Sequence, residues 1–176
     1  GAGANFFGIE AGGSRIAYIV DVSGSMRNNN RMVIAMAELK RSLRALPDYA
    51  AFMVVLYNEQ PVIAPFQRGW LRASSSNIRR MEHWIDSISP GQGTHPIPAF
   101  GHIFSLDTRP DSIFFMTDGL IPPDTVPSVS AMNGGGAHVQ INCIAFGQEA
   151  TQGSLRRLAA ESDGIFRFVP VGGGRP

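Results

Sequence analysis

The stretch RIAYIVDVSGS at residues 15–25 combines an apolar run with a turn of small polar residues. Residues 16–20 are apolar at consecutive positions, which is typical of a parallel strand covered on both faces. After the polar turn, residues 31–46 carry apolar side chains at near-helical spacing, and Pro47 closes this segment. A buried strand followed by an amphipathic helix predicts the first unit of an α/β fold.

The rest of the chain repeats this alternation of apolar runs and segments with helical spacing. The expected strands are residues 15–22, 50–57, 62–64, 112–117, 140–146 and 165–169, and the expected helices are residues 31–46, 74–87, 100–106, 125–132 and 152–160. The short link at residues 58–61 makes strand 62–64 antiparallel to its predecessor. We therefore expect a three-layer, doubly wound α/β domain whose mostly parallel, six-stranded sheet has one antiparallel edge strand.

The N-terminal segment differs from this alternation. Residues 6–9, FFGI, precede Gly12 and Gly13 and predict one arm of a short hairpin. The expected organisation is an N-terminal arm at residues 1–14, one globular domain at residues 15–170, and a flexible, glycine-rich tail at residues 171–176. A length of 176 residues fits a single domain.

The composition excludes several classes of partner. Fifteen basic residues against 14 acidic ones leave a net charge of +1, and the basic residues are scattered, so nucleic acid is not expected as a main partner. No apolar run approaches the roughly 18 residues of a membrane span, so we expect no direct membrane insertion of this domain. The single cysteine, Cys143, cannot form an internal disulfide and does not indicate a compartment.

Oxygen-bearing side chains follow two of the strongest apolar strands and one central loop. Asp21, Ser23 and Ser25 follow the first strand, Thr94 lies in the Gly/Pro-rich loop, and Asp118 ends the strand at residues 112–117. The carboxyl ends of parallel strands meet at one edge of a sheet, so both carboxylates should lie there. They repel each other unless a cation sits between them, and neither segment contains a lysine. Oxygen donors alone favour Mg²⁺ or Mn²⁺, whereas Ca²⁺ prefers more ligands and Zn²⁺ prefers sulfur or imidazole.

In order and spacing, these five residues resemble the metal-ion-dependent adhesion site of the von Willebrand factor type A domain, also called the integrin I-type domain. That site is written Asp-x-Ser-x-Ser, then a distant Thr, then a distant Asp, and the positions here are Asp21, Ser23, Ser25, Thr94 and Asp118. The resemblance extends from about residue 15 to residue 169. It implies that the serines and often the threonine bind the metal directly, while the two aspartates act largely through bridging waters.

The resemblance also implies what the site binds. One coordination position stays open, and in the family an acidic side chain of a partner protein fills it. We therefore expect a non-enzymatic binding module that holds Mg²⁺, with Mn²⁺ or Ca²⁺ as alternatives, and takes a protein ligand presenting Asp or Glu. The expected partner-binding rim consists of Met26, Gly93, His95 and Gly119.

Two other functions remain open at this point. A metal-dependent phosphoester hydrolase would use the same ion, with His95 as proton carrier. A regulatory partner of an ATP-driven chelatase or chaperone machine is the other alternative, because related domains serve there. A serine-hydrolase elbow is excluded, because it needs glycine two residues before the serine and Asp21 stands there before Ser23.

The end of the chain departs from the adhesion receptors of this family. In those receptors a helix follows the last strand and couples metal coordination to affinity, but Pro170 and three glycines follow it here. Either the sequence is truncated before that helix or this branch of the family lacks it, so the affinity switch is not carried over to this chain. The FFGI start and the glycine-rich ending resemble bacterial envelope proteins that carry this domain at their C-terminal end. This favours a location outside the cytoplasm, within a larger anchored protein, while the oligomeric state cannot be read from the sequence.

Overall fold

The computed structural model describes residues 3–147, 150 and 152–171. Five parallel strands form the centre of one sheet: β4 (Ala51–Tyr57), β3 (Arg15–Asp21), β7 (Ser112–Thr117), β8 (Gln140–Phe146) and β9 (Phe166–Val169). Two short strands, β5 (Pro61–Val62) and β6 (Leu71–Arg72), pair antiparallel with β4. The predicted mostly parallel sheet is confirmed. Strand β6 is an addition, because two residues are too few to show a strand pattern in the sequence.

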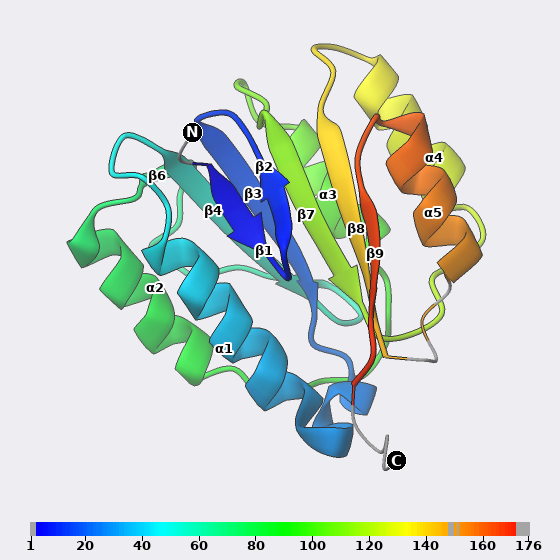
Figure 1. Ribbon diagram of the computed structural model, residues 1–176, viewed down its shortest axis with the longest axis horizontal. Coiled ribbons are helices and arrows are strands. Elements are labelled where there is room, and N and C mark those ends of the chain that lie inside the picture. Colours follow the sequence, from blue (N-terminus) through cyan, green and yellow to red (C-terminus); the bar gives the residue numbers. More distant parts are fainter. Residues whose placement is uncertain (1–2, 148–149, 151, 172–176) are drawn as a thin grey trace.

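Helices cover both faces of this sheet (Figure 1). The 3₁₀ segment η1 (Gly24–Asn30), α1 (Arg31–Arg44) and α2 (Ser75–Asp86) lie on one face. Helices α3 (Ile97–Phe104), α4 (Thr125–Gly134) and α5 (Gln152–Glu161) lie on the other. Each layer has its own apolar core, because alternate side chains of the buried strands point to opposite faces. The doubly wound, three-layer fold is therefore confirmed. Helix α1 is two residues shorter than predicted, and α3 begins three residues earlier, directly after Pro96.

An N-terminal hairpin covers part of the face that carries α1. It consists of β1 (Ala4–Phe6) and β2 (Ile9–Ala11), which pair antiparallel. Phe7 and Gly8 form the turn, with φ of 49° and 82°, as in the type I′ turns that match the twist of a hairpin. The FFGI segment is therefore the turn and its two flanking residues, and both strands lie before Gly12.

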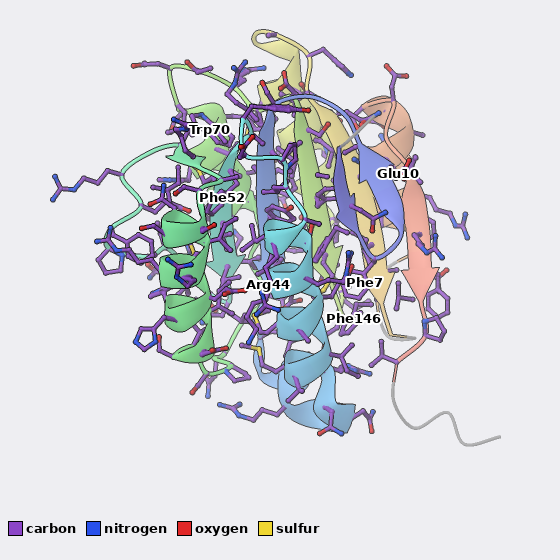
Figure 2. All side chains as sticks on the ribbon, turned by 60° about the vertical axis from the view of Figure 1, so that its left-hand side comes forward. Phe7, Glu10, Arg44, Phe52, Trp70 and Phe146 are labelled. Atoms are coloured by element: carbon purple, nitrogen blue, oxygen red, sulfur yellow. The ribbon has the colours of Figure 1, made fainter. Side chains whose placement is uncertain are left out.

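The hairpin is packed into the domain. Phe6 is fully buried, and its ring meets those of Tyr18 and Phe114 edge-on, each with centroids 5.5 Å away. The Phe7 ring packs on Phe146 with a centroid distance of 5.3 Å (Figure 2). The hairpin therefore packs into the same apolar core as residues 15–170. The predicted boundary at residue 14 lies between two segments of this shared core.

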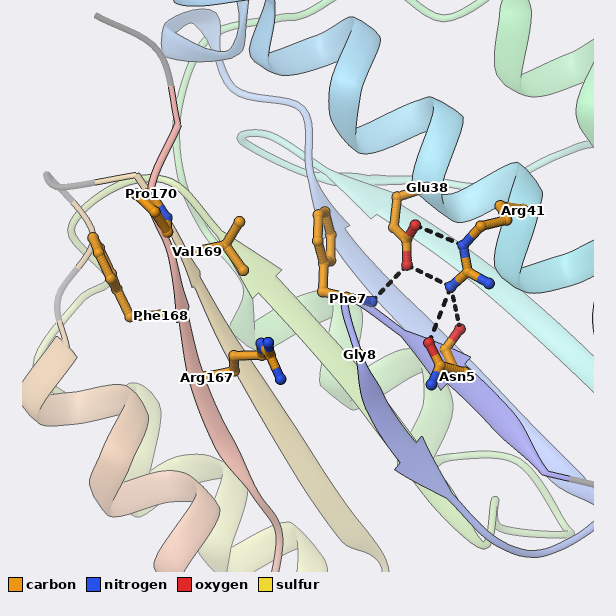
Figure 3. A pocket seen from close by; sticks show the side chains of 9 residues that line it. All are labelled: Asn5, Phe7, Gly8, Glu38, Arg41, Arg167, Phe168, Val169 and Pro170. Carbon is orange, nitrogen blue, oxygen red and sulfur yellow. Dashed lines mark hydrogen bonds and ion pairs between the residues drawn. The ribbon is translucent and has the colours of Figure 1, made fainter. Parts of the chain in front are cut away.

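Polar contacts also join the hairpin to α1 (Figure 3). The Phe7 amide donates to Glu38 Oε2 at 2.6 Å, and Arg41 Nη2 donates to the backbone and side-chain oxygens of Asn5 at 3.1 Å. Glu38 and Arg41 form an ion pair of 2.6 Å. A cavity of about 460 Å³ opens beside these residues and reaches Arg167 on β9. No helix among the described residues is long and apolar enough to cross a bilayer. Residues 172–176 of the predicted tail lie outside the described residues.

Candidate metal centre

The two predicted aspartates lie at the carboxyl ends of neighbouring parallel strands. Asp21 is the last residue of β3, and Asp118 directly follows β7. The chain leaves β3 toward α1 on one face and leaves β7 toward α4 on the other. This divergence is the topological switch point at which open α/β sheets bind their ligands.

Four of the five predicted metal ligands meet at this point. Ser25 Oγ lies 2.9 Å and 2.8 Å from the two carboxylate oxygens of Asp118 and 3.1 Å from Ser23 Oγ. Ser23 Oγ lies 3.4 Å from Asp118 Oδ1. The Asp21 carboxylate accepts from the Ser23 amide at 2.7 Å and from the Thr117 hydroxyl at 2.7 Å. The first of these is an Asx-type turn, which closes the loop after β3.

The fifth predicted ligand, Thr94, lies in a loop that is attached to the same edge. Gly91 pairs with Ser23 as a parallel bridge, and its amide donates to the carbonyl of Val22 at 2.8 Å. The neighbouring Gly93 has a φ of 87°, and a Cβ there would lie 2.3 Å from Glu59 Oε2. Only glycine fits this position. The loop is attached to the edge at Gly91, and no hydrogen bond joins the Thr94 hydroxyl to any described residue, so Thr94 lies outside the hydrogen-bond network of the cluster.

The predicted rim needs one correction. Met26 is fully buried, because its amide bonds to the Ser23 carbonyl at 3.0 Å and the resulting tight turn directs its side chain into the core. Gly93, His95 and Gly119 are partly exposed. Leu120, which the sequence analysis did not consider, is 74% exposed directly after Gly119. The sequence feature that could have indicated Leu120 is its position directly after Asp118 and Gly119, where the strand ends.

A basic residue that the sequence analysis also missed reaches the carboxylates. Arg31, the first residue of α1, donates from Nη1 to Asp118 Oδ2 at 2.9 Å, and both residues are buried. The two strand-end segments contain no lysine, but the start of α1 supplies an arginine to one of the two carboxylates. Counted over Asp21, Asp118 and Arg31 alone, the formal charge is −1.

The electrostatic state of Asp21 agrees with this residual charge. Burial and the neighbouring Asp118 raise the pKa of Asp21 to about 6, although hydrogen bonds from Ser23 and Thr117 act in the opposite direction. Two carboxylates in one buried site are costly without further positive charge. In the part of the chain that the structure describes, no three His, Cys, Asp or Glu residues gather into a metal site. A cation here would depend on serine and threonine hydroxyls besides the two carboxylates, and this all-oxygen set suits a hard divalent ion.

Comparisons with known proteins agree with this architecture. A family model described as "von Willebrand factor type A domain" matches residues 14–168. A von Willebrand factor type A structure from Catenulispora acidiphila is 22% identical with a TM-score of 0.80, and the match covers 91% of this chain but 39% of that one. An aerotolerance-related membrane protein from Bacteroides fragilis is 16% identical with a TM-score of 0.68, covering 89% of this chain and 92% of that one.

A third structure bears on the metal. Proximal thread matrix protein 1 from the mussel byssus, with a zinc-occupied MIDAS motif, is 19% identical with a TM-score of 0.68, and the match covers 90% of this chain and 42% of that protein. This chain thus spans less than half the length of the Catenulispora and byssus proteins. No curated protein sequence matches it. Because the family model covers nearly the whole sequence, this chain belongs to the von Willebrand factor type A domain family.

Proposed function

We propose that this domain binds a protein partner through a divalent cation held by Asp21, Ser23, Ser25, Thr94 and Asp118. The observation that carries the proposal is the cluster in which two serine hydroxyls from the end of β3 meet the Asp118 carboxylate from the end of β7. Domains of this family are often metal-dependent and take part in protein interactions. The byssus protein is a relative in fold with an occupied site of this kind.

The chemistry of the donors supports Mg²⁺, with Mn²⁺ or Ca²⁺ as alternatives. The clustered side chains offer hydroxyl and carboxylate oxygens, with no sulfur or imidazole among them. Such donors match hard cations. Zinc in the byssus protein is a property of that protein.

Each residue has a defined task in the proposal. Asp21 accepts from the Ser23 amide and the Thr117 hydroxyl and so holds the loop against the sheet edge. Ser23 and Ser25 offer neutral oxygens, and such ligands leave the positive charge of the bound cation largely uncompensated. When bound, the cation would supply an electrophilic coordination position for an external carboxylate. The matching partner group is therefore an Asp or Glu side chain, and the exposed Leu120 beside the site offers it an apolar contact.

The first experiment tests the cation. The protein is stripped with EDTA and melted with and without Mg²⁺ or Mn²⁺, beside the variant Ser25→Ala and the control Ser105→Ala at the exposed end of α3. At a hundredfold excess over Kd, a ligand stabilises the folded state by about 2.7 kcal/mol, which raises Tm by roughly 5–10 °C for a chain of this size. Ser105→Ala should keep this shift and Ser25→Ala should lose most of it. An unchanged wild-type melt would end the metal proposal.

The second experiment tests the partner chemistry. Peptides selected from a random displayed library in Mg²⁺ should contain Asp or Glu, and they should release in EDTA. Replacing the selected Asp by Asn, or Glu by Gln, removes a carboxylate at nearly constant shape and should abolish binding. Selected peptides without an acidic residue, or peptides that stay bound in EDTA, would contradict the proposal.

We propose a binding role and not catalysis, because no histidine side chain among the described residues hydrogen-bonds to the cluster. His95 is tied by its backbone amide to the Asn58 carbonyl at 2.9 Å. For location, a membrane protein and a pilus adhesin from Lactobacillus rhamnosus GG share this fold. We propose that this chain works in a comparable setting outside the cytoplasm. Export of the full-length protein to the cell surface is the measurement that decides it.

A further inference from the structure

The turn before α1 positions Arg31 beside the carboxylate cluster. Asn29 and Asn30 both adopt left-handed conformations, with φ of 54° and 59°, and turn the chain from η1 into α1. Side chains at the start of a helix point back toward its N-terminus, and this direction leads Arg31 to Asp118. On its other side the guanidinium lies against Gly147, where a Cβ would be 3.2 Å from Nη2.

The position of Arg31 is unfavourable for the helix itself. The first turn of α1 contains no acidic residue, and the positive end of a helix dipole repels a cation placed there. Burying a guanidinium is costly as well, and Arg31 is 4% exposed. The ion pair with the fully buried Asp118 offsets part of this cost. Arg31 is therefore placed to serve the carboxylate cluster and not the stability of α1.

Arg27, the other basic side chain of this turn, does not share that role. Its Nη2 donates to the Pro90 carbonyl on the surface. The charge that reaches the cluster is thus that of Arg31, which engages Asp118 Oδ2, while Ser25 hydrogen-bonds both oxygens of the same carboxylate.

We propose that Arg31 is a positioning residue that holds Asp118 and sets the charge of the metal centre. The inference rests on the proposed function. Without Arg31 the two aspartates would carry −2 and would neutralise a bound divalent cation. With Arg31, the charges of these three side chains and the cation sum to +1, and this added positive charge favours the carboxylate of a partner. Arg31 thus weakens cation binding and strengthens the capture of an acidic ligand, and it keeps the cation-free domain folded.

The test compares charge variants of Arg31 in this chain after EDTA treatment. Arg31→Met and Arg31→Gln remove the charge, and Arg31→Lys keeps it. Arg44→Met is the matched control. Arg44 lies at the far end of α1, where it pairs with Glu82 of α2, and it does not touch the cluster. Mg²⁺ affinity is measured by titration calorimetry, and Tm is measured with and without Mg²⁺.

Removing one positive charge next to a divalent ion should tighten Mg²⁺ binding at least about tenfold, even with strong solvent screening. Both neutral variants should show this tightening, a lower Tm in EDTA, and a larger Tm rise with Mg²⁺ than the wild type. At saturating Mg²⁺ they should bind the selected acidic peptides more weakly. Arg31→Lys and Arg44→Met should keep the wild-type Mg²⁺ affinity.

The outcomes separate the two proposals. If the wild type binds no divalent cation, the proposed function fails and this inference fails with it. If the wild type binds Mg²⁺ but the neutral variants bind it equally or more weakly, Arg31 has only a structural role and this inference alone is overturned. A neutral variant that unfolds in EDTA and refolds in Mg²⁺ supports the inference, whereas one that stays unfolded in saturating Mg²⁺ overturns it.

Discussion

Thr117 and Thr125 form a matched pair that measures how strongly the Asp21 carboxylate is held. Both threonines are fully buried. The Thr117 hydroxyl donates to Asp21 Oδ2 at 2.7 Å, whereas the Thr125 hydroxyl, at the start of α4, has no hydrogen-bond partner among the described residues. Replacing either by valine removes a hydroxyl at nearly constant shape. Only the first replacement takes a donor from a buried carboxylate.

The two replacements should change the free energy of unfolding differently. A hydrogen bond to a charged group contributes about 1.5–3 kcal/mol, so Thr117→Val should lower the free energy of unfolding by about 2 kcal/mol and Tm by roughly 4–8 °C. Thr125→Val removes an unpaired buried polar group and should be neutral or stabilising by about 1 kcal/mol. Urea unfolding of EDTA-treated protein at pH 7 measures both variants. Equal losses in the two variants, or a Thr117→Val protein as stable as the wild type, would show that the Asp21 carboxylate is not held through Thr117.

Three further predictions concern the hairpin and the loop beside the cluster. Phe6→Ala should lower the free energy of unfolding by about 3–5 kcal/mol, because it empties a fully buried ring site, and urea unfolding measures this loss. The hydrogen bonds from Arg41 and from the Phe7 amide lower the pKa of Glu38 against the opposing effect of its burial. The stability that Glu38 contributes is therefore present above its pKa in the unfolded chain and is lost as pH falls through its lower pKa in the folded protein. Glu38→Gln should be less stable than the wild type at pH 7, and its stability should decrease less steeply in acid. Measurements of Tm against pH follow both effects. A Cβ at residue 93 would collide with Glu59 and move the loop. Gly93→Ala should therefore weaken Mg²⁺ binding, as measured by calorimetry, more than it lowers the stability of the cation-free domain, as measured by Tm.

Much of the fold could be predicted from hydrophobic patterning. The consecutive apolar residues 16–20 lie in the centre of the sheet, between β4 and β7, and are fully buried. The positions of Asp21 and Asp118 then followed, because carboxyl ends of neighbouring parallel strands share an edge. Strand β6 could not be predicted, because it has two residues and pairs only near the start of β4.

The local geometry of the site was less accessible from the sequence. The place of Arg31 depends on two consecutive left-handed asparagines, and a sequence shows only that asparagine tolerates this conformation. The burial of Met26 likewise depends on a tight turn that no periodicity reveals. Both errors concern residues within six positions of Ser25, where the chain reverses and neither strand nor helix spacing applies.

Helix α1 connects the carboxylate cluster to the hairpin. Its first residue, Arg31, holds Asp118, and Glu38, about two turns later, accepts from the turn of the hairpin. A second route runs through β8, because Phe146 packs on Phe7 while the next residue, Gly147, lies against the Arg31 guanidinium. Packed elements of this kind transmit displacement because interiors contain little free volume. The hairpin and the carboxylate cluster therefore both contact α1, so a displacement of this helix relative to the sheet would change both sets of contacts.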